Sequence, residues 1–187
     1  MNPVGNKGWH SRGYLPHFDS PEIIQHIVFR TLDSLPASVV DSLSDDPAKR
    51  RTQVDEYLDR MTGARPFAVP ICATIVQDCL KRTEAQGYLL LGWCIMPNHV
   101  HVLIEQKQGH SLGVIVKSWK MTTTHAINMA FARKGRFWAL DYFDRFMRDE
   151  RHFFETLAYI ETNPIKAGLV QRPEDWKFSS ASCTGER

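Results

Sequence analysis

Two apolar segments that follow each other almost directly constrain the fold of this chain most. The first runs from Tyr88 to Met96 and the second from His99 to Glu105, with only a Pro97-Asn98 pair between them. Proline and asparagine favour turns, and parallel strands need a much longer crossover connection. We therefore expect an antiparallel β-hairpin at this place in the chain.

Hydrophobic periodicity predicts further elements on both sides of this hairpin. Strands are expected at 22–31 and 142–147, and helices at 49–61, 70–87, 111–135 and 150–162, the last one stopped by Asn163-Pro164. Apart from an inserted helix at 49–61, the order is strand, helix, strand, strand, helix, strand, helix. It predicts an α+β fold with a ferredoxin-like split β-α-β-β-α-β antiparallel sheet and an added C-terminal helix. We expect one domain over 1–187, with an irregular N-terminal arm at 1–20 and a C-terminal tail at 171–187.

Composition excludes several classes of protein. Four cysteines in 187 residues show no C-x-x-C spacing, which argues against a zinc ribbon or a disulfide scaffold and favours reduced thiols in the cytoplasm. The longest apolar run is far too short to span a membrane, and the first residues lack the apolar core of a secretion signal.

The charge is small overall but unevenly distributed. The net charge is +2, whereas residues 107–151 alone contain 9 bases and 4 acids. Such a local excess of positive charge suits a polyanionic partner, although a solvated helix face is the alternative. The bases of this region that we consider candidate contacts to a nucleic-acid backbone are Lys117, Lys120, Arg133, Lys134 and Arg136.

Four residues have the chemistry and spacing of a catalytic site. His99 and His101 lie two apart on a strand and so share one face, as two ligands of a divalent ion would. Tyr159 and Asn163 lie four apart on the last helix, one turn from each other. If that helix covers the histidine strand, a phenol and a hard amide oxygen suited to Mg²⁺ or Mn²⁺ join the pair. Half-buried histidines, a core aromatic and a helix-terminating asparagine are the structural alternatives.

Other candidates for these roles are weaker. Tyr142 is a rival nucleophile or a base-stacking aromatic. Glu105 shares the histidine face but lies near the end of the strand, where a solvated carboxylate is expected. The remaining histidines have no partner at ligand spacing and are interpreted as ordinary residues: His10, His17, His26, His110, His125 and His152.

Several segments together resemble one known family. The run Met96-Pro97-Asn98-His99-Val100-His101 resembles the HUH signature (histidine, hydrophobic residue, histidine) of bacterial single-tyrosine transposases, and the run from Tyr159 to Val170 resembles their nucleophile helix. The segments at 12–19, 135–138 and 173–180 agree in order. The combination is most similar to the REP-associated tyrosine transposases, which act on repetitive extragenic palindromes.

This resemblance implies an HUH nuclease fold and a metal-dependent enzyme that cleaves and rejoins single-stranded, hairpin-forming DNA. By position, His99 and His101 match the ligands of Mg²⁺ or Mn²⁺, Asn163 completes the site and Tyr159 matches the nucleophile. The family's N-terminal region engages unpaired bases, which points to Trp9, Arg12, Tyr14 and His17. The chain departs from the family at Trp138-Ala139-Leu140, where Trp-Gln-Arg is common.

Two other functions remain open on the sequence. One is a catalytically silent protein that binds hairpin DNA, and the other is a small metal-dependent phosphohydrolase that uses His99 and His101 with water. Retention of all four site residues favours the transposase-like enzyme over the silent protein. The REP-associated branch suggests a monomer, with a dimer as the alternative.

Overall fold

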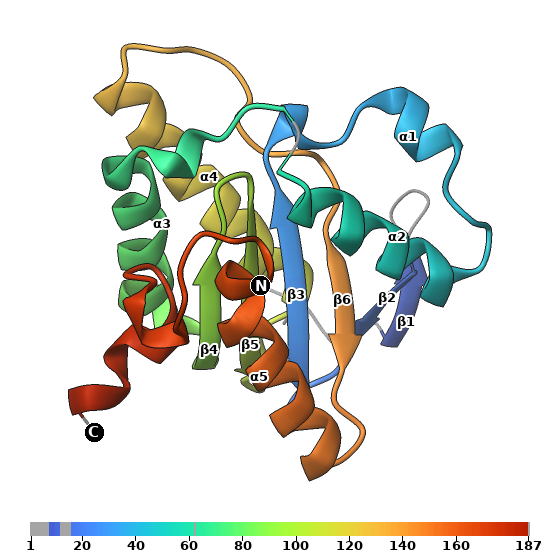
Figure 1. Cartoon of the computed structure of the whole chain (residues 1–187). Helices are drawn as coiled ribbons and strands as arrows, with labels where there is room; N and C mark the ends of the chain where they lie inside the picture. Colours follow the sequence, from blue (N-terminus) through green and yellow to red (C-terminus); the bar gives the residue numbers. More distant parts are fainter. Residues whose placement is uncertain (1–7, 12–15, 62, 187) are drawn as a thin grey trace.

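The central feature of the computed structural model is a four-stranded antiparallel sheet in the order β4-β5-β3-β6. The structure describes residues 8–11, 16–61 and 63–186. The four strands are β3 (Ile24–Arg30), β4 (Tyr88–Ile95), β5 (His99–Gln106) and β6 (Phe143–Phe146). The third strand in the chain thus lies between the second and the first, which confirms the predicted ferredoxin-like arrangement (Figure 1).

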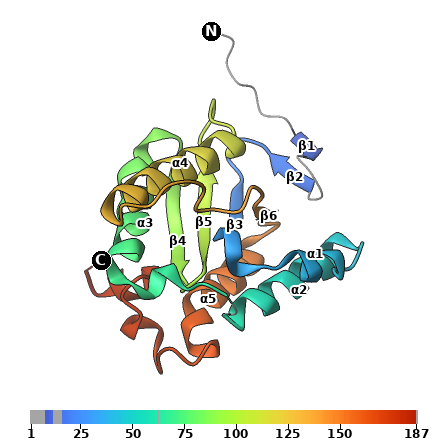
Figure 2. The same cartoon turned by 90° about the horizontal axis from the view of Figure 1, so that it is seen from above.

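Helices cover both faces of this sheet (Figure 2). α3 (Pro70–Thr83) and α4 (Leu112–Ala130) pack on one face, over a core rich in aromatic residues such as Phe29, Trp119 and Trp138. α5 (Glu150–Lys166) covers the other face, together with α2 (Pro47–Asp59), which follows the short α1 (Ala37–Asp41).

Alternation along β5 separates its side chains between these two environments. Val100, Val102 and Ile104 enter the aromatic core under α3 and α4, whereas Leu103 lies in the cluster under α5. His99 and His101 have the same parity as Leu103 and therefore face α5. The predicted sharing of one face by the two histidines is confirmed.

A glycine lets α5 approach the sheet closely. Gly92 lies beside an irregularity in the pairing of β4 with β5. A Cβ atom at this position would lie 2.6 Å from Leu157 Cδ1 of α5, nearer than two carbon atoms can pack. The absence of a side chain at Gly92 thus allows Leu157 and Ile160 to seat α5 over the sheet, where it faces His99 and His101.

The expected end of the last helix is wrong. α5 does not stop before Asn163-Pro164 but continues to Lys166. Pro164 lacks the N–H that would bond to the Ile160 carbonyl, yet Ile160, Asn163 and Pro164 are all buried. Tight packing of this turn therefore compensates for the lost hydrogen bond and keeps the helix continuous.

The N-terminal segment is also more regular than an arm. β1 (Gly8–Ser11) and β2 (Pro16–Asp19) pair as a two-stranded antiparallel sheet. Trp9 and Phe18 pack together and against Phe146 of β6, so aromatic contacts dock this small sheet on the edge of the main one. The turn-rich composition did not predict these two strands, because they are stabilised by their packing on the main sheet.

The other boundaries differ little from expectation, apart from α4, which ends at Ala130 and not at Gly135. Residues of the expected C-terminal tail pack on the edge of the main sheet: the Ile95 N–H donates to the Phe178 carbonyl at 2.9 Å, and the Trp176 indole donates to the Ile95 carbonyl at 3.1 Å.

The division into one domain, arm and tail stays a prediction. No helix in the described part of the chain is both long and apolar enough to cross a membrane.

Candidate active site

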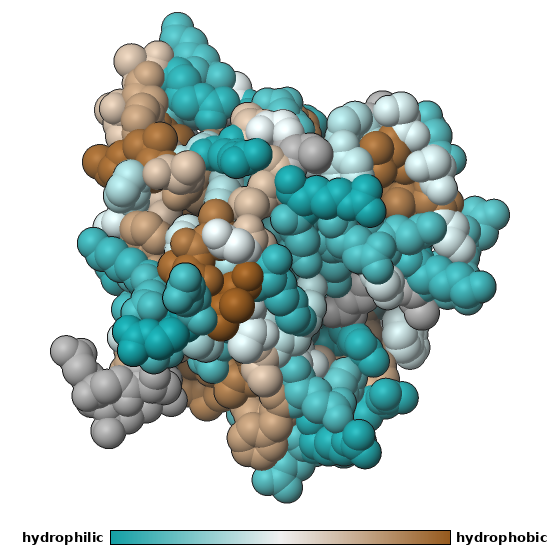
Figure 3. All heavy atoms as spheres, in the orientation of Figure 1, coloured by the Kyte–Doolittle hydropathy of each residue, from teal (hydrophilic) through white to brown (hydrophobic). Residues whose placement is uncertain are grey.

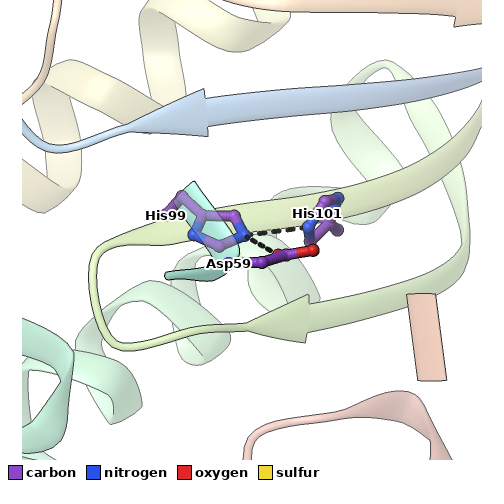
Figure 4. Close-up of side chains that lie close together, drawn as sticks. All are labelled: Asp59, His99 and His101. Atoms are coloured by element: carbon purple, nitrogen blue, oxygen red, sulfur yellow. Dashed lines mark hydrogen bonds and ion pairs between the residues drawn. The ribbon is translucent and has the colours of Figure 1, made fainter. Parts of the chain in front are cut away.

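Two buried imidazoles on β5 form the centre of the site. Figure 4 shows His99 and His101 side by side, with their Nε2 atoms 2.9 Å apart. Both residues are fully buried. Burial lowers the pKa of His99 to about 3, because a charged ring would lose its hydration. His99 is thus neutral over the physiological range, which is the state that binds metal ions.

Hydrogen bonds on the far side of each ring orient both Nε2 atoms towards the same point. Asn98 Oδ1 lies 2.7 Å from His99 Nδ1, and since this oxygen can only accept, Nδ1 carries the proton. His26 Nε2 lies 3.0 Å from His101 Nδ1. Asn163 Nδ2 donates to His101 Nε2 at 2.9 Å, which places the proton of His101 on Nδ1 too. Two lone pairs therefore face each other, an arrangement that attracts a cation.

The last helix brings the other two predicted residues to the same place. Asp149 caps the start of α5 by accepting from the His152 N–H at 2.7 Å, and one face of the helix then carries both Tyr159 and Asn163. The Tyr159 ring lies edge-on to His101, with centroids 5.7 Å apart. Lys166 Nζ lies 4.4 Å from the centre of the Tyr159 ring. The structure thus brings together all four residues predicted for the catalytic site.

A carboxylate that the sequence did not indicate completes this group. Asp59 Oδ1, at the end of α2, lies 3.7 Å from His99 Nε2. Burial raises the pKa of Asp59 to about 6, while a hydrogen bond from Asn163 and the charge of Lys166 act in the opposite direction. We call the group of Asp59, His99, His101 and Asn163 the His99 site.

The His99 site has the donor set and spacing of a divalent-metal site. Ligand atoms of Asp59, His99 and His101 all lie within 4.8 Å of one another, and nitrogen or oxygen ligands lie about 2.0–2.2 Å from a transition metal. Asn163 Oδ1 is buried and, among the described residues, has no hydrogen-bond partner. An unsatisfied buried acceptor is costly. The Nδ2 side of this amide faces His101, so rotation of the amide by half a turn would present Oδ1 to an ion bound there.

The site opens into a groove between α2 and α5. The groove has a volume of about 1020 Å³, and its lining residues include Asp59, His26, Tyr159, Trp9 and Phe146. The surface over α2 is predominantly hydrophilic (Figure 3). A cleft of this size that exposes a tyrosine beside a metal-type site can admit an extended polar chain.

The predicted DNA contacts are distributed over two sides of the molecule. Trp9 is exposed and lines the groove beside Tyr159; Arg12 and Tyr14 lie outside the described residues. The other candidates lie on α4 or after it, on the opposite side of the sheet from the His99 site (Figure 2). Of these, Lys117 and Arg136 line a second groove of about 740 Å³, and Arg133 and Lys134 are exposed.

Lys120 is occupied by contacts within the protein. Its Nζ donates to the carbonyl oxygens of Ala139, Leu140 and Asp141 at 3.1, 3.2 and 2.8 Å. Burial lowers the pKa of this lysine to about 8. These bonds give Lys120 a structural role in holding the segment before β6, and a DNA contact by Lys120 stays a prediction.

Sequence reasoning missed two contributors to the site, Asp59 and His26. Asp59 is far from the histidines in sequence and belongs to an inserted helix. His26 has no histidine at ligand spacing on its own strand, but β3 pairs with β5 so that it lies opposite Leu103 and diagonal to His101. A correct register between the two strands would have indicated His26; the sequence holds no comparable signal for Asp59.

Comparison with known proteins agrees with this geometry. Residues 70–163, from the start of α3 to Asn163 of the site, match the family described as "Transposase IS200 like". This match covers half of the chain. The chain belongs to the IS200-like transposase family.

Within this family, the similar proteins are REP-associated tyrosine transposases, as the sequence motifs predict. The Escherichia coli K12 protein is 30% identical over 102 residues, which cover 54% of this chain and 59% of that protein. A Haemophilus influenzae relative of the same group is 26% identical over 97 residues, 46% of this chain and 55% of its own length. The chain thus aligns with little more than half of each of these relatives.

A solved structure extends the likeness to nearly the whole fold. A REP-associated tyrosine transposase bound to a REP hairpin superposes with a TM-score of 0.67 over 95% of this chain and 86% of the other, at 13% sequence identity. At this identity the similarity establishes the shared fold. With 95% of this chain covered, it includes most of the chain outside residues 70–163.

Proposed function

We propose that this protein is a divalent-metal-dependent nuclease and strand transferase that cleaves and rejoins hairpin-forming single-stranded DNA through Tyr159. The observation that carries the proposal is the meeting of two distant elements: Tyr159 and Asn163 of α5 lie against His101 of β5, whose imidazole lies beside that of His99. Membership of the IS200-like transposase family supports this reaction class.

In the proposed reaction the Tyr159 oxygen attacks the phosphorus of a DNA phosphodiester. A phosphorus–oxygen bond to the tyrosine forms, the bond to the 3′ oxygen breaks, and this oxygen takes up a proton to become a 3′-hydroxyl. The DNA stays attached as a 5′-phosphotyrosine, so a 3′-hydroxyl can attack the same phosphorus and restore a phosphodiester without an external energy source.

The chain's own residues prepare this step. A phenol is a weak nucleophile near neutral pH, and a divalent cation held by His99, His101 and Asn163 would supply Lewis-acid polarisation of the phosphate. The cation–π contact of Lys166 holds the Tyr159 ring at the wall of the groove. Tyr142, the rival nucleophile, lies in the aromatic cluster under α3 and α4, which favours Tyr159.

The proposed partner is a DNA hairpin with an unpaired flank. The solved relative of this fold carries a REP hairpin, and the exposed Trp9 lines the same groove as Tyr159. An indole in such a position can stack on an unpaired base. The exposed bases Lys117, Arg133, Lys134 and Arg136 are proposed contacts to the backbone of the duplex stem.

The test is incubation of wild type and Tyr159→Phe with labelled hairpin single strands and Mn²⁺, followed by a denaturing gel. We expect a protein–DNA adduct from wild type that disappears with EDTA and with Tyr159→Phe. Tyr142→Phe is the matched control, and we expect it to retain the adduct.

Other outcomes would replace the proposal. Cleavage without an adduct would indicate the phosphohydrolase that uses water, and binding without cleavage would indicate a silent hairpin-binding protein. An adduct that persists in Tyr159→Phe and disappears in Tyr142→Phe would exchange the roles of the two tyrosines.

A further inference from the structure

The inserted helix α2 is fixed against the same face of the sheet as the active site. Val54 and Leu58 of α2 are fully buried against Val28 of β3 and Phe143 of β6. Burial of two such side chains contributes roughly 3–6 kcal/mol, enough to hold the helix in one place. The residue that follows Leu58 is Asp59, whose position is therefore set by this packing.

Asp59 turns its carboxylate towards the histidines. Figure 4 shows Asp59 next to His99 and His101, although it comes from a different element. Its Oδ1 atom is buried and, within the described part of the chain, makes no hydrogen bond. The 3.7 Å from Asp59 Oδ1 to His99 Nε2 is too long for a hydrogen bond but suits two ligands of one ion.

One amide links α2 to the orientation of His99. Asn98 accepts from His99 Nδ1 at 2.7 Å and donates from Nδ2 to the Leu58 carbonyl at 3.4 Å. The same side chain thus fixes the tautomer of one imidazole and contacts the backbone directly before Asp59. A shared support of this kind is typical of the outer shell of metal ligands.

We propose that Asp59 is a further ligand of the divalent cation, so that two imidazoles, one amide oxygen and one carboxylate from the inserted helix surround it. This inference rests on the proposed function and specifies the metal centre of that site. A carboxylate brings one negative charge to a group of otherwise neutral ligands, and mixed carboxylate and imidazole ligands suit Mn²⁺. The open positions of an octahedral ion would remain for the phosphate.

The test measures metal binding without DNA. Mn²⁺ is titrated into wild type and into Asp59→Asn, Glu56→Gln and His99→Ala, and free Mn²⁺ is followed by electron paramagnetic resonance. We expect Asp59→Asn to weaken Mn²⁺ binding at least about 10-fold. Glu56→Gln removes an exposed charge from the same helix and should stay within about twofold of wild type. Circular dichroism melts verify that each variant folds, and Asp59→His, which supplies another ligand, should recover part of the affinity.

The outcomes separate this inference from the proposed function. Wild-type affinity in Asp59→Asn together with lost binding in His99→Ala would overturn Asp59 as a ligand and leave the histidine metal site intact. Equal losses in Asp59→Asn and Glu56→Gln would overturn it too, because they would show a general charge effect. Absence of Mn²⁺ binding by wild type would contradict the metal dependence of the proposed function itself.

Discussion

Two buried histidine clusters lie in different parts of this molecule and have opposite electrostatic states. At the His99 site, under α5, burial lowers the pKa of His99 to about 3 and keeps this imidazole neutral. The His17 cluster consists of His17, Asp141 and Asp144. His17 is as deeply buried as His99, but its pKa is raised to about 9.

The carboxylates account for the difference. Burial works against charge on His17, but hydrogen bonds to Asp141 and Asp144 and the attraction of their charges outweigh it. His17 Nε2 lies 3.1 Å from Asp141 Oδ1, and Nδ1 contacts Asp144. Both ring nitrogens are therefore occupied by acceptors, as in an imidazolium. At the His99 site the two Nε2 atoms point at each other, and Asn163 donates to one of them. The His17 cluster is built to hold a proton, whereas the His99 site has the donor set of a metal site.

The same substitution in each cluster should separate activity from stability. We expect His99→Gln to lower the single-turnover rate of hairpin cleavage at least about 1000-fold, the equivalent of about 4 kcal/mol, because the proposed metal site loses a ligand. The free energy of unfolding should change by no more than about 1 kcal/mol, since one neutral polar group replaces another. Cleavage within tenfold of wild type would contradict a role of His99 in the reaction. Urea unfolding measures the stability in parallel.

His17→Gln should show the reverse pattern. Removing the protonated imidazole leaves the carboxylates of Asp141 and Asp144 without their cation. Breaking a buried ion pair in this way lowers the free energy of unfolding by about 3–5 kcal/mol. The cleavage rate of the folded fraction should stay within about threefold of wild type. His125→Gln, on an exposed face of α4, is the control and should leave stability unchanged. An equally stable His17→Gln variant would show that the cluster is not ionised.

The pH dependence of stability tests the charge on His17 directly. Its pKa is 6.5 when unfolded and about 9 when folded, so the folded state binds the proton more tightly. The resulting stabilisation, up to about 3 kcal/mol, is complete below pH 6.5, declines as the pH rises and is lost above 9. Burial lowers the pKa of Lys120 to about 8. Its loss of a proton therefore raises the stability of the folded state as the pH rises, opposite to the effect of His17. The contribution of Lys120 cancels when the unfolding free energy of His17→Gln is subtracted from that of wild type. This difference in free energy should fall between pH 6 and 9. A flat difference would contradict the assignment.

The sequence predicted the parts of the molecule that depend on local pattern. Alternation placed His99 and His101 on one face, and helical spacing placed Tyr159 one turn from Asn163. Both follow from the geometry of a single element. The strand order also followed, because a β-α-β-β-α-β series leaves few alternatives.

What the sequence could not supply depends on contacts between distant elements. The roles of His17 and His26 come from residues far away in the sequence, Asp144 on β6 and His101 on β5. Asp59 reaches the site because Val54 and Leu58 pack on Val28. Similarly, the continuation of α5 through Pro164 reflects burial of that turn, which overrides the local preference of proline.

The smallest expected effect concerns the surface over the His17 cluster. Lys117 lines the groove on α4 that also contains Asp141 and Tyr142, whereas Arg148 lines the groove over the His99 site. If the hairpin stem reaches α4, Lys117→Ala should weaken DNA binding by no more than about threefold. The slope of log affinity against log salt concentration should decrease by about one, the equivalent of one phosphate contact. Arg148→Ala is the matched variant on the other side. Binding is measured by fluorescence anisotropy over a series of salt concentrations. An unchanged slope in Lys117→Ala with a lower slope in Arg148→Ala would confine the DNA to the His99 side. The bases on α4 would then be a solvated face, and the His17 cluster would serve stability alone.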